Sequence, residues 1–199
     1  NRYKGKIYSW DVVNEAIDDN PANFLRNSKW YKICGEDFIV KAFEYAHEAD
    51  PAAKLFYNDY NTERPEKRER VYQLLKKLKA QKVPINGVGL QAHWSLQEPT
   101  INDLKTAIES YASLGLEIQF TEVDISIYPW EKERRPKRAN ESDVFTDALE
   151  QQQMAQYAMI FKTFRTYKEV ITNVTFWNIS VSSMSFLFKV IPYRDNRNV

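Results

Sequence analysis

The sequence has few of the residues that carry disulfide, metal or redox chemistry. Its 199 residues include one cysteine, Cys34, and two histidines. A single cysteine cannot form an internal disulfide, and we expect Cys34 to be a buried, inert thiol. His47 lies in a helical pattern without a second ligand four residues later, so the sequence gives no support for a zinc site. We therefore expect no metal centre.

The sequence also lacks an excess of charge and any long apolar run. It has 28 basic and 27 acidic residues, which gives a net charge of +1. This balance gives no reason to expect a nucleic-acid partner or electrostatic binding to a membrane. No apolar run approaches the about 20 residues that a membrane-spanning helix requires. No signal peptide is visible, but the first residue is Asn1 rather than Met, so this says little about the compartment.

Aromatic residues, by contrast, are abundant. There are five tryptophans and twelve tyrosines, and hydrophobic residues make up 43% of the chain. Flat aromatic rings fill protein cores, and they also line sites for sugars and bases. A chain of this length and composition can bury one sizeable core. We therefore expect residues 1–199 to belong to one globular domain.

Strand patterns and helix patterns alternate along the chain. Short apolar runs predict strands at residues 7–13, 54–59, 85–94, 116–125 and 174–180. Helical periodicity predicts helices at residues 35–51, 64–84, 100–115 and 145–167. Such alternation favours an α/β fold with a parallel sheet covered on both faces. The polar segment 131–143 is expected to be a solvated loop.

Two of the predicted helices have apolar residues at helical spacing. In the helix at 35–51 these residues are Phe38, Ala42, Tyr45, Ala46 and Ala49. In the helix at 64–84 they are Val71, Leu74, Leu75 and Leu78, and Pro65 suits its first turn.

The predicted strands end in polar or aromatic residues. These are Asn14-Glu15, Asn58-Asp59, Gln91 to His93, Glu122 and Trp177-Asn178. In parallel α/β barrels the reacting groups lie at the carboxyl ends of the strands. If these residues were only helix caps and surface positions, we would expect Ser, Asp or Gly rather than Glu, His and Trp. A polar cluster that converges at one end of a sheet is therefore the candidate functional site.

Carboxyl groups in this cluster have the pattern of an acid–base pair. Glu122 and Asp124 are two residues apart on a strand, so their side chains point to the same face. His93 could join them in a carboxylate–imidazole–carboxylate series that orients Glu122 and favours its ionised form. Glu15 follows apolar and aromatic residues, and a poorly solvated carboxyl group retains its proton near neutral pH. Glycoside hydrolases use such a pair of carboxyl groups for catalysis, and in retaining enzymes the two groups lie about 5 Å apart.

Five segments, in their order along the chain, resemble the family-10 glycoside hydrolases, which are mainly endo-β-1,4-xylanases. The segments are "WDVVNEA", "FYNDYN", "GVGLQAHW", "FTEVDIS" and "TFWNIS". The combination is highly specific, whereas "WDVVNE" alone would only be suggestive. The resemblance covers nearly all of this chain.

The resemblance implies retaining hydrolysis of xylan or xylo-oligosaccharides without a cofactor. It implies that Glu15 is the acid/base and Glu122 the nucleophile. Asn14 is similar to the residue that binds the sugar 2-hydroxyl group at the cleavage site. His93 is expected to hydrogen-bond Glu122, with Asp124 behind it. The remaining floor of the sugar site is expected to be Gln91, Tyr60 and Trp177.

The resemblance also implies a (β/α)8 TIM barrel that is incomplete in this chain. Such a barrel has eight strands and about 250 residues, whereas the sequence predicts about five βα units, equivalent to strands 4 to 8. An open barrel edge is expected to pair with a separate N-terminal barrel segment or with another copy of the chain. After "TFWNIS" the sequence departs from the family pattern. An aspartate and a second tryptophan are usual there, and this chain has Val181, Ser182 and Phe186.

Other functions stay open at this stage. An incomplete barrel, or one subunit of a split barrel, could bind xylo-oligosaccharides with little or no catalysis. Cellulose or mixed β-glucan could replace xylan as the substrate. A secreted, periplasmic or cell-surface location is expected only because cells meet such polymers outside the cytoplasm.

Overall fold

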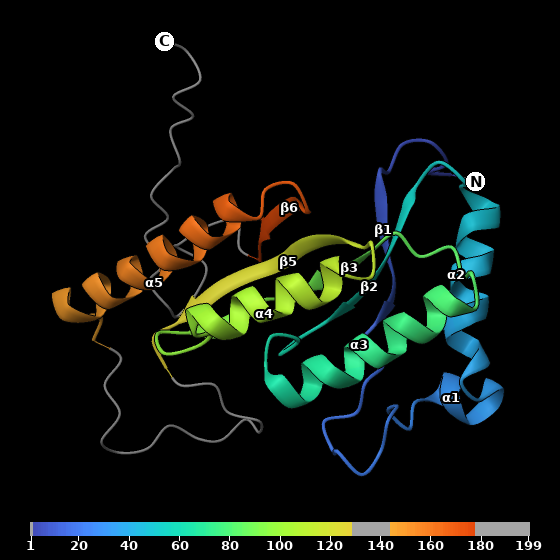
Figure 1. Cartoon of the computed structure of the whole chain (residues 1–199), viewed down its shortest axis with the longest axis horizontal. Helices are drawn as coiled ribbons and strands as arrows, with labels where there is room; N and C mark the ends of the chain where they lie inside the picture. The colour runs from blue at the N-terminus through green and yellow to red at the C-terminus, as the bar shows by residue number, and fades with distance from the viewer. Residues whose placement is uncertain (1, 129–143, 178–199) are drawn as a thin grey trace.

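The computed structural model describes residues 2–128 and 144–177 (Figure 1). Its strands are β1 (Ser9–Asn14), β2 (Lys54–Asp59), β3 (Gly87–Leu90), β4 (His93–Ser95), β5 (Glu117–Ser126) and β6 (Ile171–Phe176). Its helices are α1 (Lys29–Cys34), α2 (Asp37–Ala49), α3 (Pro65–Ala80), α4 (Ile101–Ala112) and α5 (Asp147–Thr166). The predicted alternation of strands and helices is confirmed. The short helix α1 was not predicted from the sequence.

All strand pairs in the described sheet are parallel. β1 pairs with β2, β2 with β3, and β5 with β3, β4 and β6. The stretch predicted as one strand at 85–94 is divided into β3 and β4, and both parts pair with β5. The division falls at Gln91 and Ala92, where Ala92 has a φ of 67°. The described strands therefore form five neighbouring positions of an open, incomplete barrel, as predicted.

The helices lie along the row of strands. In Figure 1, α3 and α4 lie over the strands, while α2 lies beside β1 and α5 beside β6. Aromatic rings help to fix α5, because Phe164 of α5 stacks on Phe120 of β5 with ring centroids 4.1 Å apart. Phe161 of α5 stacks on Phe176 of β6 with centroids 6.0 Å apart. These contacts attach α5 to β5 and β6.

The buried faces of the helices agree with the sequence fully for α3 and in part for α2. Val71, Leu74, Leu75 and Leu78 of α3 are all buried, as their spacing predicted. In α2, Phe38, Ala42 and Ala46 are partly buried against the core beside the fully buried Ile39 and Phe43. Tyr45, which has the same spacing, is 64% exposed. Packing against β1 and β2 decides which face is buried.

Cys34 is exposed, so the expectation of a buried thiol was wrong. It is the last residue of α1, a six-residue helix without any buried residue. Ser28 caps this helix, since its hydroxyl oxygen accepts a hydrogen bond from the Tyr31 N–H. A cysteine on such a short surface helix contributes no side chain to the core.

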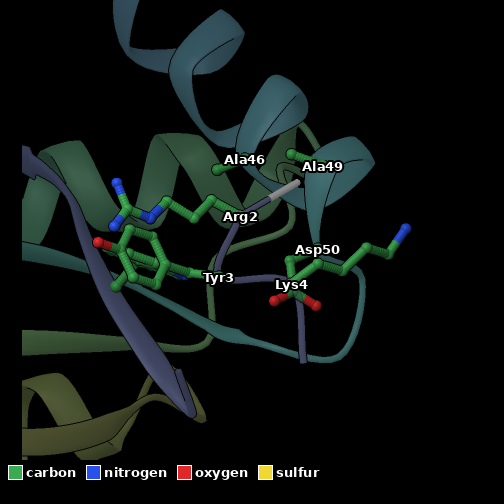
Figure 2. Close-up of a pocket in the computed structure, with 7 residues that line it drawn as sticks. Arg2, Tyr3, Lys4, Ala46, Ala49 and Asp50 are labelled. Carbon is green, nitrogen blue, oxygen red and sulfur yellow. The ribbon is translucent and has the colours of Figure 1, made fainter. Parts of the chain in front are cut away.

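A hollow of about 280 Å³ lies between the first residues of the chain and α2. It is lined by Arg2, Tyr3, Lys4, Trp10, Ala46, Ala49 and Asp50 (Figure 2). The carboxylate of Asp50 accepts a hydrogen bond from the Gly5 N–H at 2.8 Å, which attaches the N-terminal segment to α2. None of the predicted site residues lines this hollow.

Some sequence predictions concern positions that the structure does not describe. Segment 131–143, Asn178 and the divergent positions Val181, Ser182 and Phe186 lie outside the described residues. Among the described helices, none has the length and apolar character of a membrane span.

Candidate active site

Strand register brings the predicted site residues to one edge of the sheet. Asn14 at the end of β1 is aligned with Asn58 of β2. Asp59 at the end of β2 is aligned with Leu90 of β3, immediately before Gln91. His93, the first residue of β4, is aligned with Asp124 of β5. The prediction that polar strand ends converge is therefore confirmed for the described residues.

His93 lies between two carboxylates of β5, as predicted. Its Nδ1 is 3.0 Å from Asp124 Oδ2, and its Nε2 is 3.2 Å from Glu122 Oε2. Burial alone would lower the pKa of His93, but the hydrogen bonds and negative charges of Asp124 and Glu122 outweigh this and raise it. A protonated imidazole donates to both carboxylates, which orients the Glu122 side chain.

Asn58 connects β1 with β5 across the candidate site. Its Nδ2 donates to Asn14 Oδ1 at 3.0 Å and to Glu122 Oε1 at 3.3 Å. Its Oδ1 accepts from the Thr121 hydroxyl at 2.7 Å. The sequence placed Asn58 at a strand end without giving it a role. Its contacts fix the oxygen of Glu122 that His93 does not bind.

Gln91 connects Asn14 and Glu15 to the same cluster. Its Nε2 donates to Asn14 Oδ1 at 3.2 Å and to Glu15 Oε1 at 3.0 Å. Together with Asn58, these contacts form an unbroken series of hydrogen-bonded side chains from Glu15 to Glu122. Two carboxyl groups that are far apart in the sequence thus face one polar cluster.

The surroundings of Glu15 differ from those expected. The sequence suggested a poorly solvated carboxyl group, but Arg26 Nη1 lies 2.8 Å from Glu15 Oε2. The side chain of Glu15 is 30% exposed, whereas that of Glu122 is only 15% exposed. The loop that follows β1 carries Arg26 back to the strand end, and no local pattern in the sequence predicts this return. Glu15 is therefore hydrogen-bonded to a guanidinium rather than enclosed by apolar residues.

Tyr60 and Trp177 lie on different sides of the cluster. The Tyr60 hydroxyl accepts a hydrogen bond from Arg26 Nη2 and donates one to Asp19 Oδ2, so Tyr60 belongs to the surroundings of Glu15. The ring of Trp177 meets that of His93 edge-on, with centroids 6.3 Å apart. Trp177 is 58% exposed. Both aromatic residues therefore lie beside the carboxyl cluster, and their place in the floor of a sugar site stays a prediction.

Sequence reasoning overlooked Asp11 in the middle of β1. Reduced solvation raises the pKa of the Asp11 carboxyl group, and the negative charge of Glu122 raises it further. The signal of Asp11 in the sequence is an acidic residue within an apolar strand, in the segment "WDVVNEA".

The cluster can orient two carboxyl groups and bind sugar hydroxyls through Asn and Gln side chains. Within residues 2–128 and 144–177, no group of three or more His, Cys, Asp or Glu side chains is arranged to hold a metal ion.

The sequence and the fold both match known proteins. The model of Glycosyl hydrolase family 10 matches residues 1–187. An endo-1,4-beta-xylanase from Geobacillus stearothermophilus is 50% identical over 179 residues, which are 90% of this chain and 53% of that protein. A beta-1,4-xylanase from Dictyoglomus thermophilum is 52% identical over 182 residues, which are 89% of this chain and 49% of that protein. The chain spans about half the length of the curated relatives it matches.

Solved structures give the same result. The crystal structure of xylanase XynB from Paenibacillus barcinonensis matches with a TM-score of 0.83 and 43% identity, over 92% of this chain and 54% of that one. An intracellular xylanase from Thermoanaerobacterium saccharolyticum, solved with xylotriose, matches with a TM-score of 0.78 and 45% identity. That match covers 92% of this chain and 51% of the xylanase.

Proposed function

This chain belongs to glycosyl hydrolase family 10, and we propose that it performs retaining, endo-acting hydrolysis of β-1,4-xylosidic bonds in xylan. One observation carries the proposal. Glu15 and Glu122 are joined through Gln91, Asn14 and Asn58 by hydrogen bonds of 3.0–3.3 Å at the carboxyl ends of the strands. The similar proteins named as xylanases support xylan as the substrate.

In the first step, the Glu122 carboxylate attacks the anomeric carbon of the sugar on one side of the bond. The bond from this carbon to the glycosidic oxygen breaks, and Glu15 donates its proton to that oxygen. The leaving sugar departs with a new hydroxyl group. Glu122 is left bonded to the remaining sugar as a glycosyl ester.

In the second step, Glu15 acts as the base. It takes a proton from water, and the water oxygen attacks the anomeric carbon. The ester bond breaks, which releases the Glu122 carboxylate and leaves the sugar with its original anomeric configuration. Arg26 Nη1 donates a hydrogen bond to Glu15 Oε2 at 2.8 Å, which holds the carboxyl group in place for this step.

The surrounding residues would prepare Glu122 for attack. His93 and Asn58 each contact a different oxygen of its carboxylate, at 3.2 and 3.3 Å. Asp124 holds the far nitrogen of His93. This arrangement limits the rotation of the carboxylate, so that less reorganisation is needed when it attacks.

Four further residues are proposed to bind the sugar. Asn14 would bond the 2-hydroxyl group at the cleavage site, where such a bond strengthens in the transition state. Gln91 and Tyr60 would complete the polar floor, and the exposed ring of Trp177 would stack on an apolar sugar face.

A reducing-sugar assay on soluble xylan with this chain tests the proposal. We expect Glu122→Gln to abolish product release while the far-UV circular dichroism spectrum stays unchanged. The matched control is Glu117→Gln at the start of β5, where Glu117 pairs with Lys54. This variant should keep its turnover. Equal turnover of Glu122→Gln and the original chain would refute the assignment, and NMR of the first-formed anomer tests retention.

A second candidate function is sugar binding without turnover, and the open sheet favours it. Titration calorimetry with xylohexaose distinguishes the two functions. Heat of binding without new reducing ends supports a binding fragment, whereas steady product release supports the enzyme. Pairing with an N-terminal barrel segment or a second copy is the related proposal. Sedimentation that detects only monomers at micromolar concentration would argue against self-association.

Two details of the proposal depend on the substrate. Parallel assays on cellulose and mixed β-glucan test whether the chain prefers xylan. A location outside the cytoplasm is proposed from the polymeric substrate alone. Cell fractionation tests it, and the similar xylanase from Thermoanaerobacterium saccharolyticum is described as intracellular.

A further inference from the structure

The backbone at Glu15 has an unusual conformation that its neighbours must maintain. Glu15 follows β1 with a φ of 54°, in the left-handed region that residues other than glycine rarely adopt. Its N–H donates to the Asn58 carbonyl oxygen at 2.8 Å. A residue in this region stays there only where the surrounding structure holds it. The direction of the Glu15 side chain depends on whatever fixes this turn.

The buried hydroxyl group of Tyr57 supports the turn at Glu15. Its side chain is completely buried in β2. Its hydroxyl oxygen accepts hydrogen bonds from the N–H groups of Ala16 and Ile17, at 3.1 and 3.2 Å. The same hydroxyl donates to Asp59 Oδ2 at 2.5 Å. One donor and two acceptor positions are thus all used, and the two residues after Glu15 are both attached to this one oxygen.

Asp59 connects Tyr57 to Lys67 of α3. It is completely buried, and its Oδ1 lies 2.9 Å from the ammonium group of Lys67 on α3. Lys67 also contacts Asp19 Oδ1 at 3.3 Å. Asp19 belongs to the loop that follows β1. The buried ammonium therefore ties this loop to the end of β2.

The series then returns to Glu15. The Tyr60 hydroxyl donates to the other oxygen of Asp19 and accepts from Arg26 Nη2. The second nitrogen of the guanidinium, Nη1, donates to Glu15 Oε2 at 2.8 Å. The contacts thus form a ring that starts at the backbone after Glu15, ends at the Glu15 carboxylate and is closed by Glu15 itself. Its members are Tyr57, Asp59, Lys67, Asp19, Tyr60 and Arg26.

We propose that Tyr57 is a positioning residue for Glu15 and that it acts through this closed ring. The inference rests on the proposed role of Glu15 as the acid/base. Tyr57 is buried and cannot touch a substrate, so its effect has to pass through the Glu15 backbone and the ring. Without its hydroxyl, the two N–H groups lose their acceptor, and the left-handed turn loses its support.

The test compares Tyr57→Phe with Tyr111→Phe. Tyr111 of α4 is also completely buried, and its hydroxyl donates to the Thr62 carbonyl oxygen at 2.8 Å. Both variants lose one buried hydroxyl, but only Tyr57 contacts the turn. We expect amide hydrogen exchange at Ala16 and Ile17 to accelerate at least about tenfold in Tyr57→Phe. It should stay unchanged in Tyr111→Phe once global stability is allowed for.

The kinetic readout separates positioning from general support of the fold. With xylohexaose, kcat of Tyr57→Phe should fall about tenfold while KM stays within about twofold, because ground-state binding is preserved. Tyr111→Phe should keep the kcat of the original chain. Equal loss of kcat in both variants, or unchanged exchange at Ala16 and Ile17 in Tyr57→Phe, would overturn the proposal.

Failure of the proposed function is distinguishable from failure of the ring. If the original chain releases no product, the hydrolytic function fails. The ring is then judged by amide exchange and by the NMR signal of the Glu15 carboxyl carbon, which should shift in Tyr57→Phe only. If Tyr57→Phe does not fold, Asp19→Asn opens the same ring at a partly exposed position. It should shift the Glu15 carboxyl signal, and an unchanged signal would overturn the proposal.

Discussion

Gly89 provides the space in which the Asn58 side chain crosses the sheet. A Cβ atom at Gly89 would lie 2.4 Å from Asn58 Oδ1, well inside normal contact distance. Because position 89 carries no side chain, Asn58 can reach from β2 over β3 to Thr121 and Glu122 of β5. The glycine is required here for close approach of a side chain rather than for backbone freedom.

Gly89→Ala should therefore uncouple Asn58 from Glu122. The added methyl group displaces a buried side chain, and such overpacking costs about 1–3 kcal/mol of stability. We expect xylan turnover to fall by more than this loss of stability explains. The control is Gly87→Ala, whose Cβ would lie 2.1 Å from the Phe56 ring and 2.5 Å from the Glu117 carbonyl oxygen but does not meet Asn58. Assays well below both melting temperatures check the prediction, which is wrong if the two variants lose equal activity.

Stability should depend on pH through His93. Its folded-state pKa is raised by the hydrogen bonds and charges of Asp124 and Glu122, despite opposing burial, and the unfolded value is about 6.5. The contribution of His93 to stability is therefore complete below pH of about 6.5 and is lost as pH rises through the folded-state value. This contribution is measured by urea unfolding of the original chain and of His93→Gln, between pH values of roughly 5.5 and 9.

In His93→Gln this part of the pH dependence should disappear. The control is His47→Gln, because His47 is the other histidine and lies exposed on α2. This variant should follow the pH dependence of the original chain. A His93→Gln curve parallel to that of the original chain across the whole range would contradict the prediction.

Arg26→Lys should impair activity nearly as much as Arg26→Met. The guanidinium donates to Glu15 and to the Tyr60 hydroxyl through different nitrogens, and a lysine ammonium cannot reproduce this fixed fork. A hydrogen bond to a charged group contributes about 1.5–3 kcal/mol, so we expect kcat to fall about tenfold or more. Arg165→Lys on the exposed side of α5 is the control. Full activity of Arg26→Lys would show that positive charge alone is sufficient.

Trp177→Ala should weaken sugar binding with little effect on folding. The ring is 58% exposed and contacts His93 edge-on, so its removal leaves no cavity in the core. Loss of an aromatic stacking contact of about 1 kcal/mol predicts roughly fivefold weaker binding of xylohexaose by calorimetry. Trp30→Ala, which removes a 67% exposed ring on α1, is the matched control. Equal weakening in both variants would remove Trp177 from the sugar site.

The sequence predicted most of the fold because strands and helices have different apolar periods. The alternation of strands and helices, the buried face of α3 and the parallel sheet all follow from local patterns. For α2 the sequence pattern included Phe38, Ala42 and Ala46, which are partly buried against the core, but only the structure shows that Tyr45 is exposed. The exposure of Cys34 likewise depends on packing, since Tyr31 of the same short helix is partly buried against the core.

The carboxyl cluster could also be predicted, because parallel strands place their carboxyl ends at one edge of the sheet. His93 between Glu122 and Asp124 follows from this rule and from the two-residue spacing on β5. The surroundings of Glu15 do not follow, since Arg26 reaches it only after the loop beyond β1 turns back.

The sequence by itself thus determined the fold class and which polar side chains lie at the carboxyl ends of the strands, because both depend on short-range periodicity and strand direction. Only the tertiary structure decided what surrounds each group. A loop, a left-handed residue and a missing Cβ at Gly89 bring side chains together over distances that no local pattern encodes. Contacts of this kind depend on where the whole chain runs, and they set the orientation of the Glu15 and Glu122 side chains.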